Sequence, residues 1–428
     1  MFKRVLIANR GEIAVRIIRA CQEMGIETVA VYSDEDADAM HVRLADYSYN
    51  IGPADASESY LNIDALMEAA ERTEADAVHP GYGFLSEDAD FAEMVTKAGM
   101  TWIGPWADTI RKVGDKDEAR AAMIPSGIPM SKGSTPLTSV EDAVEQAKDV
   151  GYPIILKPVA GGGGKGMLIA NSEDDLRNIL TIIDINKVKY YFEHYIEHSR
   201  HIEVQIVADN YGHVIHLGER ECSLQRRNQK LLEESPSIAL TPDRRAEVGA
   251  LAIKAAKSVH YNNIGTVEFL LDLKTNQFNF MEINPRIQVE HGVTEAVTGI
   301  DLVRTQIRIA AGESLDLQQE DVKFTGHAIE CRINAEDPDN NFMPSPGKID
   351  FFLEPGGPRV RVDSGVCAGL SISPYYDSLI AKIVVRGRTR GDAIKIMRRA
   401  LNEFKVGGIK TTIPLHQRIL KNEYFCTD

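Results

Sequence analysis

The chain has 428 residues, and its 43% hydrophobic and 26% charged residues lie close to the average of folded globular proteins, which excludes disordered, collagen-like and small disulfide-rich classes. Lys and Arg number 48 and Asp and Glu 63, so the formal net charge is −15, which disfavours general nucleic-acid binding but allows local sites for anions. At about 150 residues per domain, the length predicts two large domains or roughly three smaller ones.

The first 112 residues follow the alternation of an α/β domain. Residues 4–34 contain a strand, a turn, an amphipathic helix and a second strand, which is the pattern of a βαβ unit. Helical and strand patterns then alternate over residues 61–105. The first turn, NRGEIA, lacks the GxGxxG motif of dinucleotide-binding domains, so we do not expect an NAD site there.

The pattern changes after residue 112. Residues 113–130 are predicted to be a helical segment that carries Lys116 and ends in a loop rich in Gly, Pro and Ser, which is typical of a domain junction. A helix and a strand then begin a second unit, and strand patterns dominate residues 190–290. Strands mixed with one helix fill the region from about 325 to 428.

The cysteines and the N-terminal residues indicate in which cellular compartment the protein is expected. The five cysteines are odd in number, widely spaced and without a CxxC pair, which argues against a disulfide framework and a zinc site. The N-terminus has too short an apolar run for a signal peptide, and no stretch approaches the ~18 apolar residues of a membrane span. The sequence therefore predicts a cytoplasmic protein that binds neither membrane nor nucleic acid.

A glycine-rich segment, KPVAGGGGKGMLIA, lies between two predicted strands. It contains GxGxxG, but a strand rather than a helix follows, and no Gly-Lys-Ser or Gly-Lys-Thr completes a Walker A loop. One interpretation is a hairpin tip whose backbone N–H groups close over phosphates, with Lys157 and Lys165 as charge partners. The alternative is a flexible hairpin without a ligand.

Two carboxylates face each other in a second predicted hairpin. The strands GTVEFLLD and QFNFMEIN are separated by LKTN, and a hairpin centred on Thr275 places Glu268 opposite Glu282. Facing carboxylates repel each other, and a divalent cation between them removes that cost. An oxygen-only site with room for phosphate suits Mg²⁺. The alternative is two independent exposed glutamates in another register.

Polar residues recur at every second position after this hairpin. An extended chain would place them on one face; they are Glu282, Asn284, Arg286, Gln288 and Glu290. Pro285 removes a ladder donor, so we expect a sheet edge or an irregular loop over a cavity. A solvated edge strand is the competing interpretation.

Three further segments give weaker evidence of a functional site when each is considered alone. His201 lies on the polar face of RHIEVQIVAD, where a surface histidine is the simpler interpretation. SLQRRNQK could contact phosphates or ribose, or could be a basic loop. HPGYGFLSED, which includes Tyr82, follows a strand at the edge of a sheet where ligands often bind.

In order along nearly the whole chain, nine motifs resemble the biotin carboxylase component of biotin-dependent carboxylases: RVLIANRGEIAVRIIRA, HPGYGFLSE, VGDK, LKPVAGGGGKGM, RHIEVQI, ERECSLQRRNQK, NPRIQVEH, ECRINAED and PYYDSLIAK. The resemblance implies an ATP-grasp fold with α/β and α+β parts, namely an N-terminal Rossmann-like domain, a mobile glycine-rich lid and a C-terminal domain. The implied bounds are 1–112, a helical linker over 113–130, the lid over 131–202, the central ATP-grasp domain over 203–325, and 326–428.

The resemblance also implies a ligase that uses ATP, Mg²⁺ or Mn²⁺ and bicarbonate to carboxylate biotin on a carrier protein through carboxyphosphate. The residues implied to bind ATP are Lys116, Lys157, Gly161, Gly162, Gly163, Gly164, Lys165, Gly166, Glu193, His194, Ile196, His201, Gln225, Asn228 and Lys230. Those implied for bicarbonate and biotin are Tyr82, Lys230, Arg286, Gln288, Val289, Glu290 and Arg332. Glu290 is implied to be the general base, Arg332 to stabilise the biotin enolate, and Glu268, Glu282 and Asn284 to bind the metal.

The remaining expectations concern partners. The chain has no Met-Lys-Met biotin-attachment site and no carboxyltransferase domain after residue 428, so we expect a separate biotin carboxyl carrier protein and carboxyltransferase subunit, with the chain itself a homodimer. Asn-Pro-Arg at residues 284–286 favours a pyruvate carboxylase subunit over an acetyl-CoA carboxylase subunit. The competing interpretations are another ATP-grasp ligase or a non-catalytic ATP-binding subunit. Arg286, Glu290 and Arg332 disfavour the first, and intact Glu268, Glu282 and Glu290 disfavour the second.

Overall fold

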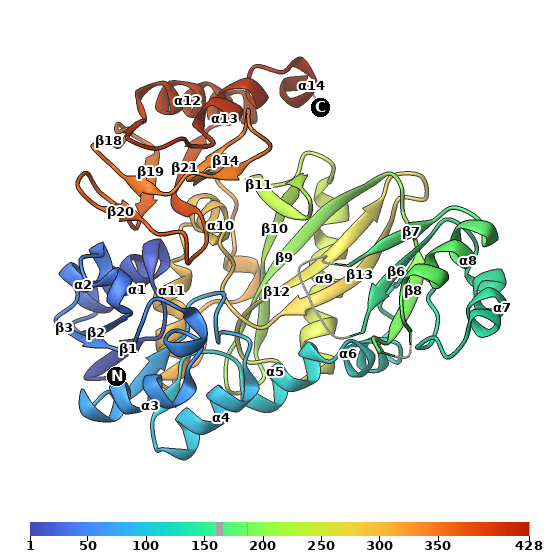
Figure 1. Cartoon of the computed structure of the whole chain (residues 1–428), viewed down its shortest axis with the longest axis horizontal. Helices are drawn as coiled ribbons and strands as arrows, with labels where there is room; N and C mark the ends of the chain where they lie inside the picture. Colours follow the sequence, from blue (N-terminus) through green and yellow to red (C-terminus); the bar gives the residue numbers. More distant parts are fainter. Residues whose placement is uncertain (160–165, 186, 428) are drawn as a thin grey trace.

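The computed structural model describes residues 1–159, 166–185 and 187–427. The N-terminal unit is a five-stranded parallel sheet in the order β3-β2-β1-β4-β5, with helices on both faces, as the βαβ pattern predicts (Figure 1). Its elements are β1 (Arg4–Ile7), α1 (Gly11–Glu23), β2 (Glu27–Tyr32), η1 (Asp34–Asp36), α2 (Met40–Leu44), β3 (Tyr47–Asn50), η2 (Ala56–Glu58), α3 (Ile63–Arg72), β4 (Ala77–His79), α4 (Ala89–Lys97) and β5 (Thr101–Trp102).

Two short helices, α5 (Ala107–Gly114) and α6 (Lys116–Met123), lead out of this unit. They are separated at Asp115, whose carboxylate accepts hydrogen bonds from the backbone N–H groups of Asp117 and Glu118, at 2.9 and 3.0 Å. Such a cap satisfies donors that the first helical turn leaves free. Lys116 is therefore fixed as the first residue of α6.

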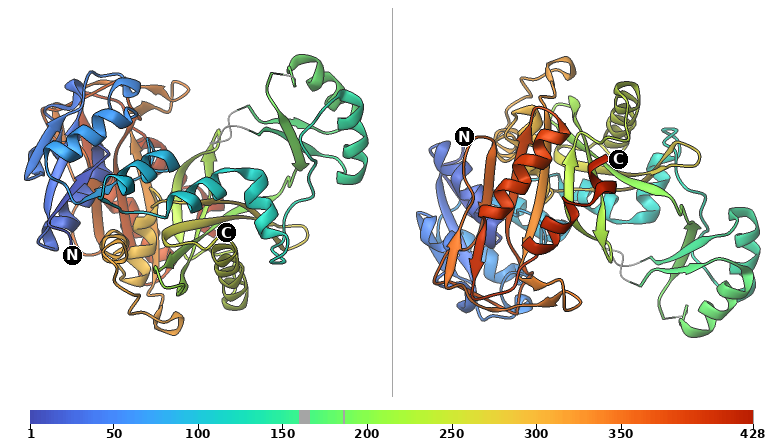
Figure 2. Two further views of the ribbon diagram at one scale, coloured as in Figure 1. Left: turned by 90° about the horizontal axis from the view of Figure 1, so that it is seen from below. Right: turned by 90° about the horizontal axis from the view of Figure 1, so that it is seen from above.

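The next unit contains a three-stranded antiparallel sheet, β7-β6-β8, backed by two helices. The elements are α7 (Val140–Val150), β6 (Ile154–Pro158), β7 (Leu168–Ala170), α8 (Glu173–Ile182) and β8 (Tyr190–His194). Leu156, Leu176 and Phe192 belong to a core cluster separate from the cores of the other units. Figure 2 shows this unit extending away from the rest of the molecule.

An eight-stranded antiparallel sheet, β13-β12-β9-β10-β11-β14-β21-β19, forms the body of the remaining chain. Its strands are β9 (Ser199–Ala208), β10 (Val214–Arg226), β11 (Gln229–Ser235), β12 (Asn263–Asp272), β13 (Gln277–Asn284), β14 (His327–Asn334), β19 (Val360–Ser364) and β21 (Leu379–Gly387). Because β11 pairs with β14, the sheet is continuous across the expected boundary at residue 326. The domain bounds stay a prediction.

Helices cover this sheet. They are α9 (Pro242–Ser258), α10 (His291–Thr298), α11 (Leu302–Ala310), α12 (Arg390–Glu403), α13 (Ile413–Ile419) and α14 (Glu423–Thr427), with a 3₁₀ turn η3 (Gln319–Asp321). Short strands complete the C-terminal part: β15 (Glu336–Asp337), β16 (Met343–Pro344), β17 (Gly347–Lys348), β18 (Phe351–Leu353), β20 (Ser371–Ile372) and β22 (Lys405–Gly407). Ile202, Val204 and Ile206 of β9 pack in the same core cluster as residues of α9, so the opposite face of β9 presents its polar residues.

The segment SLQRRNQK is the tip of a long hairpin rather than a loop, because β10 ends within it at Arg226 and β11 begins within it at Gln229. Arg227 and Asn228 occupy the turn with φ angles of 50° and 65°. Two positive φ angles are typical of the type I′ turn that matches the twist of a hairpin, and asparagine tolerates this conformation well. None of the helices in the described residues is long and apolar enough to cross a membrane.

Two buried histidines predict acid sensitivity. Burial lowers the pKa of His41 to about 4 and that of His416 to about 4. The unfolded chain binds a proton on each below pH ~6.5, while the folded chain does not, so stability falls as pH decreases from 6.5 toward 4. Each histidine is expected to lower the free energy of unfolding at pH 5 by about 2 kcal/mol relative to pH 7.

Urea unfolding at pH 7 and pH 5 measures this effect. His41→Gln should reduce the difference between the two unfolding free energies by about 2 kcal/mol. The exposed His198 provides the control, and His198→Gln should leave the difference unchanged. An unchanged difference in His41→Gln would contradict the assignment.

Candidate active site

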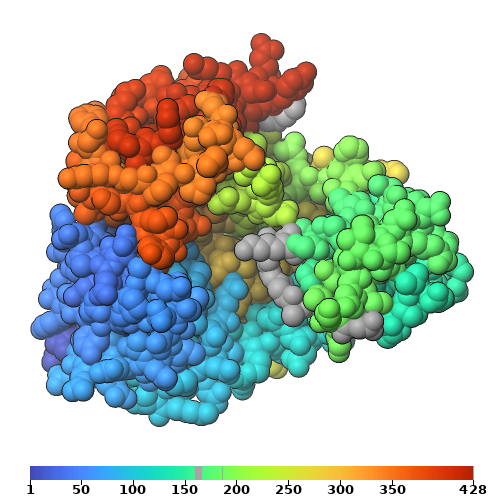
Figure 3. Space-filling view, in the orientation of Figure 1, coloured from blue at the N-terminus to red at the C-terminus, as the bar shows by residue number. Residues whose placement is uncertain are grey.

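A cavity of about 1060 Å³ lies where the N-terminal unit, α6, the β6-β7-β8 unit and the eight-stranded sheet meet. Figure 3 shows the molecule hollowed between the blue N-terminal unit, the orange C-terminal part and the green β6-β7-β8 unit. The lining includes Tyr82, Lys116, Lys157, Glu193, His201, Gln225, Asn228, Lys230, Glu268, Glu282, Asn284, Arg286, Gln288, Val289 and Arg332. The tertiary structure therefore brings most predicted site residues to one cavity.

A single ammonium group joins three carboxylates at the floor of this cavity. Lys230 Nζ donates to Glu290 Oε1 at 2.8 Å, to Glu268 Oε1 at 3.2 Å and, over a short contact, to Glu203. Burial lowers the pKa of Lys230, but the three carboxylates outweigh it and raise the pKa well above its usual value. Lys230 is thus a fixed cation at the centre of the site.

The hairpin of β12 and β13 places Glu268 opposite Glu282, which confirms the predicted register. The turn itself differs from the prediction, because Asp272 pairs with Gln277 and the hairpin is not centred on Thr275. An irregularity next to Glu268 adds one residue on β13 and restores the pairing. β13 is also the edge strand of the sheet, as Pro285 indicated.

The environment of Glu268 and Glu282 fits a divalent cation. Enclosure in the cavity, with the like charges of Glu268 and Glu87, raises the pKa of Glu282. Burial also raises the pKa of Glu268, but Lys230 and His201 outweigh it and lower the pKa. An ionised carboxylate facing a second one of like charge favours a cation between them, and an oxygen-only donor set completed by Asn284 suits Mg²⁺ or Mn²⁺.

A second group of donor atoms, on His201, Glu203 and Glu268, lies within 4.8 Å. His201 Nε2 is 3.1 Å from Glu203 and 3.0 Å from Glu268. Burial lowers the pKa of His201, but the two carboxylates raise it to about 10 overall. With these carboxylates beside it the imidazole is protonated at neutral pH, and it must lose that proton before it can bind a metal ion. Gln225 Nε2 lies 3.1 Å from the other ring nitrogen of His201.

Residues 285–290 leave β13 as an irregular loop, and the polar side chains of this loop converge. Arg286 donates to Gln288 Oε1 at 2.6 Å and to Asn284 Oδ1 at 3.1 Å. Asn284 and Gln288 in turn donate to Glu268 at 2.9 and 3.1 Å. Across the cavity, Arg286 Nε donates to Glu87 of the N-terminal unit at 2.7 Å.

Glu290 lies at the end of this loop, immediately before α10, and is fully buried. One carboxylate oxygen accepts from Lys230 and the other from Arg332 Nη2 at 2.8 Å. Burial and the Glu203 carboxylate raise the pKa of Glu290, but Lys230 and Arg332 lower it overall. Glu290 is therefore ionised at neutral pH. Arg332 also donates to Glu233 at 2.6 Å, and burial raises the pKa of Glu233 to about 7.

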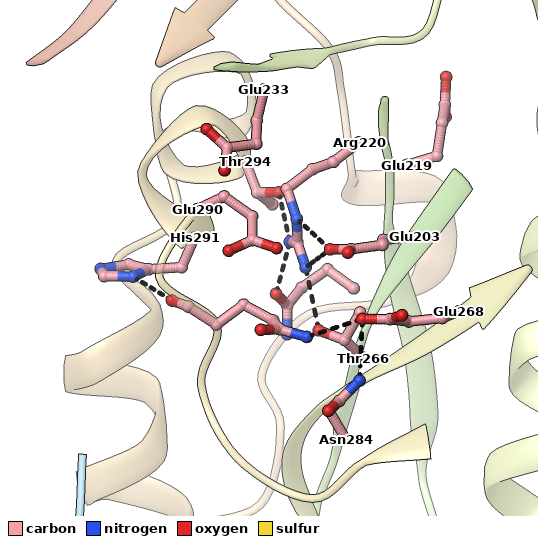
Figure 4. Close-up of polar contacts among 12 residues, drawn as sticks. Glu203, Glu219, Arg220, Glu233, Thr266, Glu268, Asn284, Glu290, His291 and Thr294 are labelled. Carbon is pink, nitrogen blue, oxygen red and sulfur yellow. Dashed lines mark hydrogen bonds and ion pairs between the residues drawn. The ribbon is translucent and has the colours of Figure 1, made fainter. Parts of the chain in front are cut away.

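A buried guanidinium, that of Arg220, contacts the Glu203 carboxylate and the polar groups around it (Figure 4). Arg220 has no exposed surface and donates to Glu203, to Gln205 at 2.7 Å, to Thr266 at 2.9 Å and to Thr294 at 3.0 Å. These partners come from β9, β12 and α10, so one side chain joins three elements. The carboxylate of Glu203 is consequently held between Arg220 and Lys230.

Two further lysines, Lys116 and Lys157, line the cavity. Lys157 on β6 donates to Glu193 on β8 at 2.6 Å, and Glu193 also accepts from Arg120 of α6 at 2.7 Å. Burial lowers the pKa of Lys116. Two lysines in one large cavity are suited to bind phosphates.

Several predicted residues stand apart from this arrangement. His194 and Ile196 are not among the described residues that line the cavity, and His194 Nδ1 instead lies 3.0 Å from the carbonyl oxygen of Gly151. Gly166 follows the glycine-rich segment with a φ of 76°. Gly161, Gly162, Gly163, Gly164 and Lys165 lie outside the described residues.

No sequence pattern assigned a role to four residues of the site. Glu87, Glu203 and Glu233 each contact a predicted site residue, namely Arg286, Lys230 and Arg332. Arg220 contacts Glu203. The alternation in β9 placed Glu203 on the polar face with His201, which was the available signal. Glu87 and Arg286 are 199 residues apart, and no local pattern relates them.

Family models match three consecutive parts of the chain. They are "Biotin carboxylase, N-terminal domain" over residues 1–110, "Carbamoyl-phosphate synthase L chain, ATP binding domain" over 115–318 and "Biotin carboxylase C-terminal domain" over 330–428. Biotin carboxylase 1 of Bacillus subtilis is 55% identical over 432 residues, covering 99% of this chain and 96% of the relative. A pyruvate carboxylase subunit of Methanothermobacter thermautotrophicus is 48% identical over 432 residues, covering 99% of this chain and 88% of the relative.

A solved structure agrees over the whole chain. It is the biotin carboxylase domain dimer of 2-oxoglutarate carboxylase from Hydrogenobacter thermophilus, in complex with MgADP, ADP and bicarbonate. It matches with a TM-score of 0.95 at 48% identity, covering 100% of this chain and 95% of that chain. The fold is therefore the ATP-grasp fold expected from the sequence, and the chain belongs to the biotin carboxylase family.

Proposed function

We propose that this chain carboxylates biotin with bicarbonate at the expense of ATP. The observation that carries the proposal is Glu290, a fully buried carboxylate held ionised between Lys230 and Arg332. Glu290 itself is not among the described residues that line the cavity, but its neighbour Val289 and both of its cationic partners are, together with Lys116 and Lys157. The relatives named as biotin carboxylases and the solved relative with MgADP and bicarbonate support the same reaction. ATP, Mg²⁺ or Mn²⁺ and bicarbonate are the corresponding substrates and cofactor.

The first half of the reaction needs a nucleophile. Bicarbonate attacks the γ-phosphoryl group well only after it has lost its proton, and a fixed carboxylate beside it supplies the base. Glu290 is ionised and buried, and Arg286 lies four residues before it in the same loop to orient the anion. We assign Glu290 as the general base and Arg286, Gln288 and Val289 to the bicarbonate pocket.

The phosphate end needs positive charge. Lys116 and Lys157 are assigned to the ATP phosphates, and phosphate binding would compete with Glu193 for Lys157. Glu268 and Glu282, with Asn284, would hold the metal, which when bound neutralises charge on the phosphate oxygens. Lys230 lies between this pair and the base and can stabilise an anion formed between them.

The second half transfers the carboxyl group to biotin. Carboxyphosphate breaks its C–O bond to release CO₂ and phosphate, and the phosphate takes the proton of the biotin ureido nitrogen. Arg332 stabilises the resulting enolate, whose nitrogen attacks CO₂ to form carboxybiotin. Tyr82 borders the cavity and is assigned to biotin. We propose that biotin is delivered by a separate carrier protein, that a partner subunit transfers the carboxyl group to pyruvate or acetyl-CoA, and that the chain forms a homodimer in the cytoplasm. The dimeric solved relative and the pyruvate carboxylase relative support these assignments.

Phosphate release from Mg-ATP, measured with each of the four combinations of bicarbonate and free biotin, tests the proposal. Release should require bicarbonate and increase when biotin is added. Release that is independent of both would refute the proposed reaction and favour another ATP-grasp ligase or a nucleotide-binding protein without this activity.

A further inference from the structure

A lysine outside the assigned machinery is completely buried near the active-site cavity. Lys382 lies on β21, has no exposed surface, and its Nζ donates a short hydrogen bond to the backbone carbonyl oxygen of Val289. Val289 immediately precedes Glu290. The ammonium therefore contacts the peptide next to the assigned base, although Lys382 is not among the described residues that line the cavity.

The same ammonium reaches the N-terminal unit. Lys382 Nζ lies 3.4 Å from Glu12 Oε1 on α1, and that oxygen accepts a short hydrogen bond from the hydroxyl of Tyr82. Tyr82 follows β4 in the segment that borders the cavity. Lys382 and Glu12, which lines the cavity, thus connect two loops, one carrying Tyr82 and the other carrying Glu290.

Other charged groups near Lys382 are either engaged elsewhere or lack contacts. Asp363 faces Lys382 across β19 and β21, but Arg361 binds both of its oxygens at 2.9 and 2.7 Å. Both carboxylate oxygens of Glu330, one strand away on β14, have no hydrogen-bond partner among the described residues. Glu12 is therefore the carboxylate that Lys382 contacts.

The loop needs this support because its backbone is irregular. Residues 285–290 lie between β13 and α10 and form no strand, so side chains bind the carbonyl oxygens there. Arg286 donates to the carbonyl oxygen of Ile287 at 3.2 Å. The Nδ1 atom of His291 lies 2.8 Å from the carbonyl oxygen of Gln288. Among the described residues, Lys382 is the side chain that binds the carbonyl of Val289.

We propose that Lys382 is a positioning residue for biotin carboxylation, which fixes the Val289–Glu290 peptide and, through Glu12, the Tyr82 loop. The inference rests on the proposed function. It assigns Lys382 no contact with substrate, and its effect is on the placement of the base relative to bicarbonate. A misplacement of about 1 Å can cost on the order of 10²-fold in rate.

The test must separate positioning from the cost of an unpaired buried charge. Lys382→Met alone leaves Glu12 buried without its cation, which destabilises the fold. We therefore compare Glu12→Gln with the double variant Lys382→Met/Glu12→Gln, in which neither side chain is charged. Glu12→Gln keeps the hydrogen bond from Lys382 to Val289 but leaves the buried ammonium without its ion pair, so its melting temperature is measured against wild type and it serves as the reference for kcat.

The readouts are thermal unfolding, the KM for ATP and kcat for bicarbonate-dependent phosphate release. In the double variant we expect kcat to be 10- to 100-fold below that of Glu12→Gln. The KM for ATP should stay within twofold, because Lys116 and Lys157 lie on α6 and β6, whereas Lys382 contacts Val289 and Glu12. The KM for free biotin should increase in both variants. A kcat in the double variant within threefold of Glu12→Gln would overturn the proposal.

A further variant covers the case in which the double variant does not fold. Lys382→Gln/Glu12→Gln fills the same space with polar groups but shortens the side chain below the reach needed for Val289, and the same threefold criterion applies. Wild-type protein is measured in parallel. If wild type releases no phosphate in response to bicarbonate, the proposed function fails, whereas an active wild type with an equally active double variant refutes the positioning role alone.

Discussion

Replacing Glu290 by Gln is expected to lower bicarbonate-dependent phosphate release from ATP by about 10²- to 10⁴-fold, the usual contribution of a positioned general base. The amide keeps the size of the side chain but cannot accept the bicarbonate proton. Lys230 retains Glu203 and Glu268 as partners, and Arg332 retains Glu233, so the loss should lie in kcat rather than in folding.

The measurement is phosphate release against bicarbonate concentration, together with the Kd for ATP and the melting temperature. Glu313→Gln is the matched control, because Glu313 is a partly exposed glutamate paired with Arg308 and should show wild-type rates. A Glu290→Gln enzyme with more than half of the wild-type kcat would remove Glu290 from the role of base.

Replacing Glu282 by Gln is expected to raise the Mg²⁺ concentration needed for half-maximal phosphate release by at least about tenfold, since an ionised ligand of a hard cation is lost. The metal-free protein should be as stable as wild type or more stable. The reason is that burial, together with the like charges of Glu268 and Glu87, raises the pKa of Glu282, and the neutral amide removes both the cost of burying the charge and the repulsion.

The two effects have opposite signs, which distinguishes a metal ligand from a structural residue. Melting temperatures in EDTA and in Mg²⁺ give the stability, and phosphate release against Mg²⁺ gives the affinity. Glu247→Gln, on an exposed helix surface of α9, controls for the loss of one negative charge. A lower melting temperature in EDTA with an unchanged Mg²⁺ requirement would contradict the assignment.

Glu268 and Glu282 show which features of a hairpin local sequence patterns can predict and which they cannot. The register of Glu268 and Glu282 follows from two recognisable strands and a short connection, so it was predictable. The turn was not, because the added residue next to Glu268 shifts the pairing without a sequence signal that identifies it. The turn in SLQRRNQK was not predictable either, because the position of Arg227 and Asn228 in the turn depends on the pairing of β10 with β11.

Local patterns were enough to predict the α/β alternation of the N-terminal unit, most strands of the large sheet, the polar face of residues 282–290 and the family. These features depend on periodicity and on motifs within a few residues of each other. Contacts between charged groups that are distant in the sequence are known only from the folded chain. They join Arg286 to Glu87, Arg220 to Glu203, Arg332 to Glu233 and Lys382 to Glu12. The hydrogen bond from Lys382 to the Val289 carbonyl oxygen is of the same kind. These contacts depend on strand order and on the packing of α1 and α10 against the sheet, and their energies arise from burial that no local pattern encodes.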